Sequence, residues 1–334
     1  VAGEGALPRA LEWSRASGFP LLAEPASGAW KNGGVVPFEQ SLVASSLGRE
    51  VDTVVVTGRP TLSRPIQALL ARPDVRVVVV DPHSPWVDIS GNASVVVADL
   101  EPAREPISAA QAEWASRVRD AARDAGERID SLLASGSGRT MLDLARAVAS
   151  STSGPLVLGA SNPVRAFDLG VSSLEGCVVH SNRGQAGIDG TIATAVGICL
   201  GSGCADEASA PTRERVTAVM GDLTACHDAS SLALAAGVDA HLDIVVADDQ
   251  GGGIFATLEH GRAASPEAYD RWFGLAQSVD YEALAAAYGV AFARAETPAQ
   301  LAQLLEIGEV GPRLVHAPVE RAAHLYPALR DVLS

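Results

Sequence analysis

The sequence predicts an α/β fold built from two domains, each with a doubly wound parallel sheet. Short runs of β-branched and aliphatic residues alternate with helical or turn-rich stretches along the chain. This alternation is typical of a parallel sheet with helices on both faces. Residues 215–255 illustrate it, because two apolar runs there flank a helical stretch and each run ends in an aspartate. A length of 334 residues suits two domains of ordinary size.

The first hundred residues predict the strands of one α/β domain, whose start we expect to be truncated. The predicted strands are Leu21–Glu24, Thr53–Val56, Arg76–Val80 and Ser94–Ala98, and the predicted first helix is Leu7–Trp13. The stretch Thr57–Pro65 follows a strand and opens a helix. Its glycine turn could hold an anion beside Arg59 and Arg64. The alternative is a helix start that Thr61 or Ser63 caps.

Residues 101–115 predict a linker, because the sequence turns polar there and Pro102 and Pro106 bracket charged residues. Residues 116–334 predict the second α/β domain. The helices expected from the linker onward are Trp114–Leu133, Met141–Ala149, Thr191–Leu200, Tyr281–Tyr288 and Thr297–Glu306, and the strands are Pro155–Leu158, Cys177–His180, Val216–Met220, Leu242–Ala247, Val290–Arg294 and Arg313–Ala317. We also expect Asp228 to cap a helix over Ala229–Ala236.

Composition and charge exclude several classes of partner. The formal net charge is −15 and the pI is about 4.8, so the general field of the protein repels nucleic acid and anionic membranes. No apolar run reaches the ~18 residues of a membrane span and no signal peptide is present, which predicts a soluble, cytoplasmic protein. The four cysteines are not spaced like a zinc site, and we expect them to be reduced thiols.

Two aspartates, Asp222 and Asp249, each follow a predicted strand of the strand–helix–strand unit. Strands joined by a helical crossover run parallel, so both carboxylates should meet at the carboxyl edge of one sheet. Two carboxylates and a free carbonyl form an oxygen site of the kind that Mg²⁺ accepts, with positions left for water or a diphosphate. Three glycines after Gln250 free the backbone to fold closely around a ligand. The alternative is that Asp222 only ends a strand and Asp248–Asp249 only starts a turn.

Two arginines are predicted to lie at the same edge. Arg165 is in the segment that follows one strand, and Arg183 is in the loop that follows the next strand along the chain. Arginines brought together by separate loops make a site for carboxylates, since a guanidinium group can hold a carboxylate with two hydrogen bonds. The alternative is that each arginine pairs with a structural acid such as Asp168 or Asp189.

These motifs resemble those of the thiamine-diphosphate enzymes. The run Gly221-Asp222-Leu223, followed by Asp248-Asp249-Gln250-Gly251, is similar to the metal and diphosphate motif of that family, which usually closes on paired asparagines. The runs Gly159-Ala160-Ser161-Asn162-Pro163-Val164-Arg165 and Ser181–Gly190 narrow the resemblance to the 2-succinyl-5-enolpyruvyl-6-hydroxy-3-cyclohexene-1-carboxylate synthases of menaquinone biosynthesis. The resemblance implies a middle domain over residues 1–100 and a diphosphate-binding domain over residues 116–334. On this resemblance, we expect the pyrimidine-binding N-terminal domain of the family to be missing from this chain.

The resemblance implies thiamine diphosphate and Mg²⁺, or Mn²⁺, as cofactors. It assigns the metal to Asp222, Asp249 and the carbonyl of Gly251, and it makes Ile188 the wedge that bends the cofactor. The implied cofactor contacts are Ile188, Gly221, Asp222, Leu223, Thr224, Asp249, Ile254 and Phe255, and the implied substrate contacts are Ser161, Arg165, Arg183 and Leu258.

The resemblance further implies a transferase, a decarboxylating carboligase that joins 2-oxoglutarate to isochorismate. The full-length enzyme is expected to be a homodimer or homotetramer. The family's catalytic glutamate belongs to the N-terminal domain, so we expect no catalytic residue in this chain and no activity from the chain alone. Two alternatives stay open. One is another thiamine-diphosphate enzyme, such as an acetolactate-synthase-like carboligase or a 2-oxoacid decarboxylase, and the other is a non-catalytic α/β module that binds a nucleotide or acts as a scaffold.

Overall fold

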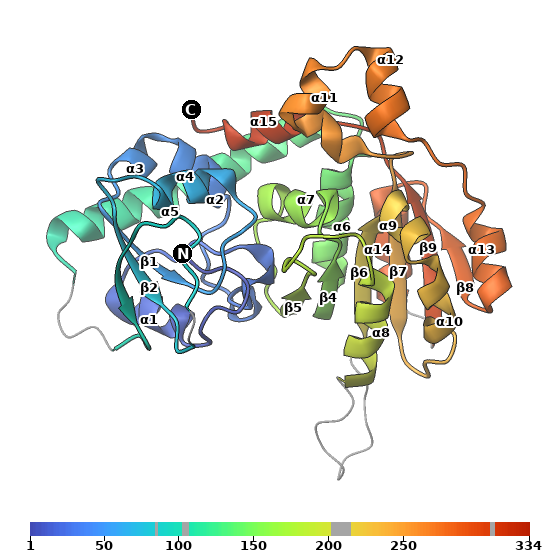
Figure 1. The fold of residues 1–334 in the computed structure, drawn as a ribbon, viewed down its shortest axis with the longest axis horizontal. Helices are drawn as coiled ribbons and strands as arrows, with labels where there is room; N and C mark the ends of the chain where they lie inside the picture. Colours follow the sequence, from blue (N-terminus) through green and yellow to red (C-terminus); the bar gives the residue numbers. More distant parts are fainter. Residues whose placement is uncertain (84–85, 102–106, 202–214, 308–310) are drawn as a thin grey trace, which may run out of the picture. The chain divides into compact units, whose positions relative to one another are not determined.

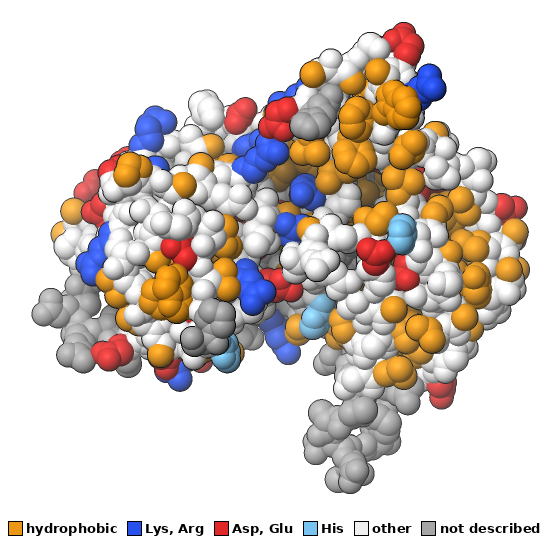
Figure 2. Space-filling view, viewed as in Figure 1, with side chains coloured by type: hydrophobic (Ala, Val, Ile, Leu, Met, Phe, Trp, Pro, Cys, Tyr) orange, Lys and Arg blue, Asp and Glu red, His pale blue; other side chains and the backbone are white. Residues whose placement is uncertain are grey.

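The computed structural model describes residues 1–83, 86–101, 107–201, 215–307 and 311–334 (Figure 1). Its contacts divide the chain into two compact units. The first unit is Val1–Leu132 with Asp168–Gly176 and Ala328–Ser334, and the second is Leu133–Phe167 with Cys177–Pro327. Each unit contains one parallel sheet with helices, which confirms the predicted α/β class. On the face drawn in Figure 2, acidic and basic side chains are interspersed with apolar ones.

The first unit has a three-stranded sheet in the order β1-β2-β3. The strands are β1 (Thr53–Thr57), β2 (Arg76–Val80) and β3 (Ala93–Val97), and the helices are α1 (Ala10–Ser17), α2 (Glu39–Ala44), α3 (Ser46–Arg49), α4 (Arg64–Leu70) and most of α5 (Ala109–Ala134), with 3₁₀ turns η1 (Pro25–Ser27) and η2 (Trp30–Asn32). These three strands confirm the prediction. The expected strand Leu21–Glu24 is wrong, because in this segment only Ala23 forms an isolated bridge, with Ala2. The first helix begins at Ala10 rather than Leu7.

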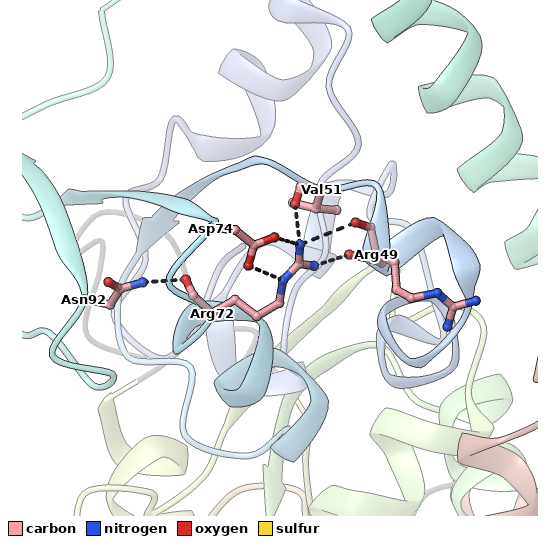
Figure 3. A network of polar contacts seen from close by, with 6 residues as sticks. Arg49, Val51, Arg72, Asp74 and Asn92 are labelled. Carbon is pink, nitrogen blue, oxygen red and sulfur yellow. Dashed lines mark hydrogen bonds and ion pairs between the residues drawn. The ribbon is translucent and has the colours of Figure 1, made fainter.

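Arg72, just after α4, forms hydrogen bonds that connect the end of this helix to α3 and to the segment that follows α3 (Figure 3). Its guanidinium group donates to the carbonyls of Gly48 at 2.8 Å and Val51 at 3.2 Å, and it forms a two-point pair with Asp74. Asn92 in turn donates to the Arg72 carbonyl at 2.9 Å. The start of α4 confirms the simpler of the two sequence interpretations, because the Ser63 hydroxyl accepts the Ile66 N–H at 3.3 Å and caps the helix.

The boundary between the units lies later than the linker that we expected at residues 101–115. The contacts place α5 in the first unit as far as Leu132, so residues 116–132 do not belong to the unit that follows. The reason is an apolar stripe on α5. Val118 and Ala122 pack in one buried cluster with Val36, Leu42 and Leu47. Of the expected linker itself, residues 102–106 lie outside the described part of the chain.

The second unit has a six-stranded sheet in the order β5-β4-β6-β7-β9-β8, and every pair of neighbouring strands is parallel (Figure 1). The strands are β4 (Gly154–Leu158), β5 (Cys177–His180), β6 (Val216–Gly221), β7 (Leu242–Asp248), β8 (Ala291–Arg294) and β9 (Pro312–Pro318). All six confirm the prediction to within about a residue at each end. Because the strands are parallel, the segments that follow β4, β5, β6 and β7 all start at one edge of the sheet.

Helices precede, connect and follow these strands. They are α6 (Met141–Ser151), α7 (Asn162–Gly170), α8 (Thr191–Gly201), α9 (Asp222–His227), α10 (Leu232–Ala235), α11 (Glu259–Ala263), α12 (Pro266–Tyr269), α13 (Tyr281–Tyr288), α14 (Pro298–Ile307) and α15 (Leu325–Arg330), with 3₁₀ turns η3 (Ala229–Ser231) and η4 (Gly253–Thr257) and a π-helical turn η5 (Asp270–Gly274). Apolar side chains are exposed over α11, α12 and η5 (Figure 2), and the Trp272 side chain is 65% exposed.

The connection between β6 and β7 differs from the expectation. A helix begins at Asp222 itself, and the expected helix Ala229–Ala236 is split into η3 and α10. The Asp228 carboxylate caps a different helix, since it accepts the N–H of Ile192 at 2.6 Å in the first turn of α8. It also accepts the Ser231 hydroxyl at 2.6 Å. A buried carboxylate can thus serve a helix that is distant in sequence, which local capping patterns do not reveal.

One core cluster of the second unit lies against one face of its sheet. Met220, Ile244 and Val246 on the strands pack with Ile192 and Leu232 on the helices, and each of these side chains is at most 1% exposed. Within the described residues, no helix is long and apolar enough to cross a membrane.

Candidate functional site

Asp222 is the first residue of α9 and lies at the carboxyl edge of the second unit's sheet. The backbone N–H groups of Leu223 and Gly251 lie close enough to this carboxyl group to lower its pKa. The second of these contacts joins the end of β6 to the loop after β7. The residue is 2% exposed, and its Oδ2 atom is buried without a hydrogen-bond partner among the described residues. A buried carboxylate oxygen of this kind needs a counter-charge or a donor.

The loop after β7 has a tightly constrained backbone. Asp248 Oδ1 accepts the Gln250 N–H at 2.9 Å and closes a turn. Gln250 has φ +58° and Gly251 has φ +127°. A Cβ at Gly251 would lie 1.8 Å from the Gly274 carbonyl oxygen, so only glycine fits there. Glycine at this position therefore lets the loop pack against η5; its predicted approach to a ligand stays a prediction.

The two candidate metal-binding carboxyl groups influence one another. Burial, together with a smaller contribution from the nearby charge of Asp248, raises the pKa of Asp222 to about 6. Burial also raises the pKa of Asp249 to about 7, with the charge of Asp222 as the next cause. The pKa of Asp248 is lowered: burial would raise it, but the hydrogen bonds from His316 and the Gln250 N–H and the charges of His316 and Arg294 together outweigh burial. Two buried carboxyl groups with raised pKa values are what a divalent cation would stabilise in the ionised form.

The oxygen atoms available at this edge would suit a hard divalent cation that takes its remaining ligands from outside the chain. Asp222 and Asp249 supply carboxylate oxygens, and the Gly251 carbonyl accepts only the Gly253 N–H in the described structure, at 3.1 Å. A carbonyl oxygen has a second lone pair for a cation. In the described part of the chain, no three His, Cys, Asp or Glu side chains form a metal-binding group. The site therefore depends on two carboxylates and a carbonyl, with the remaining ligands left to water or diphosphate oxygens.

The two predicted arginines come together. Arg165 Nη1 donates to the carbonyl of Ser161 at 2.7 Å and to that of Ala160 at 3.2 Å. Arg183 Nη1, from the loop after β5, donates to the same Ala160 carbonyl at 3.2 Å. Two guanidinium groups from separate loops therefore share one acceptor at this edge of the sheet.

The acids that were considered as structural partners for the arginines have other contacts. Asp168 accepts the Gln40 side-chain N–H at 2.5 Å. Asp189 Oδ1 lies 3.3 Å from His227 Nδ1 in an exposed pair.

A cavity of about 70 Å³ joins the loop after β4 to the loop after β7. Asn162, next to Ser161, and Asp249 both line it, together with Tyr326. The Asn162 Oδ1 atom and the Tyr326 hydroxyl are buried without a partner among the described residues. The cavity shows that the start of the segment that follows β4 and the loop that carries Asp249 border one common space.

The remaining predicted site residues occupy the same edge of the sheet. Ile188 is half-buried in the loop that leads into α8, and Thr224 is buried in α9. Phe255 in η4 packs against Phe273, with ring centroids 5.7 Å apart. Gly221, Leu223, Ile254 and Leu258 are half-buried in the strand end, helix and loop where the prediction placed them. Their contacts with a cofactor or substrate stay predictions.

Sequence reasoning missed Arg321 and the role of His316. Arg321 Nε donates to the Asp249 carbonyl at 2.8 Å, and His316 Nε2 lies 2.9 Å from Asp248 Oδ2. The available signal was their position. His316 is near the end of β9 and Arg321 follows that strand, so both lie at the edge where the aspartates were expected.

Comparisons with known proteins agree with this geometry. Residues 171–317 match the thiamine pyrophosphate enzyme C-terminal TPP-binding domain. The chain is 39% identical over 332 residues to the 2-succinyl-5-enolpyruvyl-6-hydroxy-3-cyclohexene-1-carboxylate synthase of a Nocardioides species, covering 96% of this chain and 60% of that relative. The synthase of Renibacterium salmoninarum is 37% identical, over 97% of this chain and 57% of the relative. The chain thus spans somewhat more than half the length of these relatives.

The likeness therefore reaches nearly the whole chain, and the matched domain contains Arg183, Ile188, Asp222 and Asp249. It includes β5, β6 and β7, but not β4, which precedes Ser161 and Arg165. The chain therefore carries a thiamine pyrophosphate enzyme C-terminal domain, and it is similar over nearly its whole length to the 2-succinyl-5-enolpyruvyl-6-hydroxy-3-cyclohexene-1-carboxylate synthases.

Proposed function

We propose that this chain carries the diphosphate-binding and substrate-binding part of a decarboxylating carboligase that joins 2-oxoglutarate to isochorismate in menaquinone biosynthesis. The observation that supports this most is the convergence at one sheet edge. The Gly251 N–H, in the loop of Asp249, lies close enough to the Asp222 carboxyl group to lower its pKa, and Arg165 and Arg183 donate to one carbonyl. The relatives are named as synthases of 2-succinyl-5-enolpyruvyl-6-hydroxy-3-cyclohexene-1-carboxylate. This name supports the choice of 2-oxoglutarate and isochorismate as substrates.

Thiamine diphosphate, when bound, supplies the electron sink for decarboxylation and carbon–carbon bond formation. In this proposal Asp222, Asp249 and the Gly251 carbonyl hold Mg²⁺ or Mn²⁺ against its diphosphate. The buried, unpartnered Oδ2 atom of Asp222 supports that assignment. The other proposed cofactor contacts are Ile188 as the wedge, with Gly221, Leu223, Thr224, Ile254 and Phe255.

The proposed substrate contacts are Ser161, Arg165, Arg183 and Leu258. Both substrates carry carboxylates, and the chain has a net charge of −15, so an anionic substrate needs local positive charge to bind. Two guanidinium groups provide it in a planar geometry that suits carboxylates. The half-buried Leu258 would cover the apolar part of the pocket and help to exclude water.

The choice of donor substrate tests the proposal. The chain is fused to the part of the Nocardioides synthase that the match leaves uncovered, and product formation from isochorismate is followed with 2-oxoglutarate or pyruvate as donor. We expect turnover with 2-oxoglutarate and little with pyruvate, which lacks the second carboxylate. Preference for pyruvate would indicate an acetolactate-synthase-like activity. Failure of the fused protein to bind thiamine diphosphate with Mg²⁺ would indicate a non-catalytic module.

We also propose that the chain acts in the cytoplasm as part of a homodimer or homotetramer. Among the described residues, Cys177, Cys199 and Cys226 form no disulfide with one another. Light scattering of the fused protein measures its oligomeric state, and a monomer at micromolar concentration would contradict the assembly.

A further inference from the structure

Arg321 contacts the candidate cation loop from the segment that follows β9. Its Nε donates to the Asp249 carbonyl at 2.8 Å, and its Nη2 donates to the Gln250 carbonyl. A Cβ on Gly251 would lie 3.1 Å from the same Nη2. The guanidinium group therefore holds two consecutive carbonyls and packs against the third residue of the loop.

The conformation that Arg321 holds is one that the loop would not adopt easily by itself. Gln250 has φ +58°, in the left-handed region that non-glycine residues rarely occupy. Its N–H is tied to Asp248 Oδ1 at 2.9 Å and its carbonyl is tied to Arg321. Both sides of the unusual residue are thus fixed by charged side chains, which makes the conformation stable before a ligand arrives.

β9 and the segment that follows it also contact the residue at the start of the loop, Asp248. His316 Nε2 lies 2.9 Å from Asp248 Oδ2, and the Val319 N–H donates to the Asp248 carbonyl at 2.9 Å. These contacts fix the base of the loop at the end of β7. Arg321 fixes its tip, where the carboxylate of Asp249 and the carbonyl of Gly251 are carried.

Charge gives Arg321 a second effect. Asp222, Asp248 and Asp249 gather three carboxyl groups at this edge. The guanidinium group is permanently charged and lies directly against the loop that carries two of them. It can therefore offset part of their repulsion and keep the loop closed in the absence of a cation.

We propose that Arg321 is a positioning residue for the cation site: it sets the backbone of Asp249 and Gln250 so that the Asp249 carboxylate and the Gly251 carbonyl are presented together. The inference rests on the proposed cofactor site. Arg321 acts through the loop and is not itself a ligand. It should therefore govern the affinity for the cation and diphosphate while leaving the stability of the second unit nearly unchanged.

The test measures Mn²⁺ binding to the fused protein described above, with this chain as wild type or variant, by electron paramagnetic resonance in the presence of thiamine diphosphate. We expect Arg321→Met to weaken Mn²⁺ binding roughly 10–100-fold, as is typical for loss of a residue that supports a metal ligand. Arg321→Lys keeps the charge but cannot span both carbonyls. Its affinity for Mn²⁺ should therefore lie between that of wild type and that of Arg321→Met. The control is Arg123→Met, which removes the same charge from a 68% exposed side chain paired with Asp120 and should bind as wild type does.

Three results would overturn the inference. Binding by Arg321→Met within twofold of wild type, with the wild type binding well, would refute the positioning role alone. A fall in the unfolding temperature of Arg321→Lys that accounts for its weaker binding would reduce the residue to a structural one. Failure of the wild-type fused protein to bind Mn²⁺ with thiamine diphosphate would instead refute the proposed cofactor site, and the role of Arg321 with it.

Discussion

Arg165 and Arg183 donate to the same backbone carbonyl, that of Ala160, each at 3.2 Å. They come from different loops, after β4 and after β5, and they are 18 residues apart in sequence. Two positive groups at one acceptor repel each other unless an anion lies nearby, so this arrangement is suited to binding a carboxylate.

The arginine pair predicts a loss of substrate affinity on substitution. Arg183→Met in the fused protein should lower kcat/KM for 2-oxoglutarate roughly 10–100-fold, because charged hydrogen bonds contribute about 1.5–3 kcal/mol. Arg183→Lys should recover part of this loss, since it keeps the charge without the planar fork. Steady-state kinetics measure both variants. Equal kcat/KM for wild type and Arg183→Met would contradict the assignment.

Gly253 makes room for the Asp249 carboxylate. A Cβ at Gly253 would lie 2.0 Å from Asp249 Oδ2, so Gly253→Ala must move that carboxylate. We expect this variant to weaken Mn²⁺ binding at least tenfold without any change in charge. The control is Gly197→Ala in α8, where a Cβ meets nothing within 4 Å and alanine favours the helix. Unchanged binding by Gly253→Ala would show that Asp249 is not a ligand.

The buried carboxyl group of Glu24 should make the stability of the first unit depend on pH. Burial raises its pKa from 4.5 to about 7, although the N–H of Leu62 donates to it. The folded state therefore binds this proton more strongly than the unfolded state. The contribution is fully present below pH 4.5 and is lost as the pH rises through 7, with an upper limit of about 3 kcal/mol.

Replacing Glu24 by glutamine separates its effect on stability from the effects of the other titratable groups. Glu24→Gln keeps an oxygen for the Leu62 N–H, so it should resemble wild type at pH 5 and unfold at higher urea concentration than wild type at pH 8. The exposed Glu12→Gln serves as the control. Burial also raises the pKa of Glu39 in the same unit, so some pH dependence should persist in the variant. An identical pH profile for Glu24→Gln and wild type would contradict the prediction.

A buried ion network stabilises the second unit. Asp243 accepts from Arg313 at 2.7 Å and from Arg215 at 3.0 Å, and the Asp243 and Arg313 side chains are 5% and 4% exposed. Asp243→Asn leaves two arginines without their counter-charge and should lower the free energy of unfolding by about 3–5 kcal/mol. Asp120→Asn, in an exposed pair, should change it by less than ~1 kcal/mol. Urea unfolding followed by circular dichroism measures both, and a loss below ~1 kcal/mol for Asp243→Asn would be inconsistent with a buried network.

Much of the second unit was predictable from the sequence because its strands are continuous apolar runs. Leu242–Asp248 is buried along nearly its whole length, so a run of β-branched residues identified it. Strand ends then located Asp222 and Asp249, because parallel connectivity places them on one edge. The same connectivity predicted that Arg165 and Arg183 would meet.

Other features depend on contacts between distant segments and could not be predicted. Asp228 caps α8 from 36 residues away, and Arg321 reaches the Asp249 carbonyl from 72 residues away. The boundary of the first unit was misplaced because the apolar stripe of α5 was interpreted as part of the following domain. A helix pattern shows which face is apolar but not which unit that face contacts.

Binding of thiamine diphosphate, measured by calorimetry with and without Mg²⁺, tests the central claim most directly when wild type is compared with Asp222→Asn. The asparagine keeps an oxygen for the Leu223 and Gly251 N–H groups but removes the charge. We predict that wild type binds only when Mg²⁺ is present and that Asp222→Asn loses affinity by more than roughly 100-fold, because it removes a ligand rather than a supporting residue. Equal binding by the two proteins, or wild-type binding that persists in chelator, would contradict the claim that this sheet edge holds a cation.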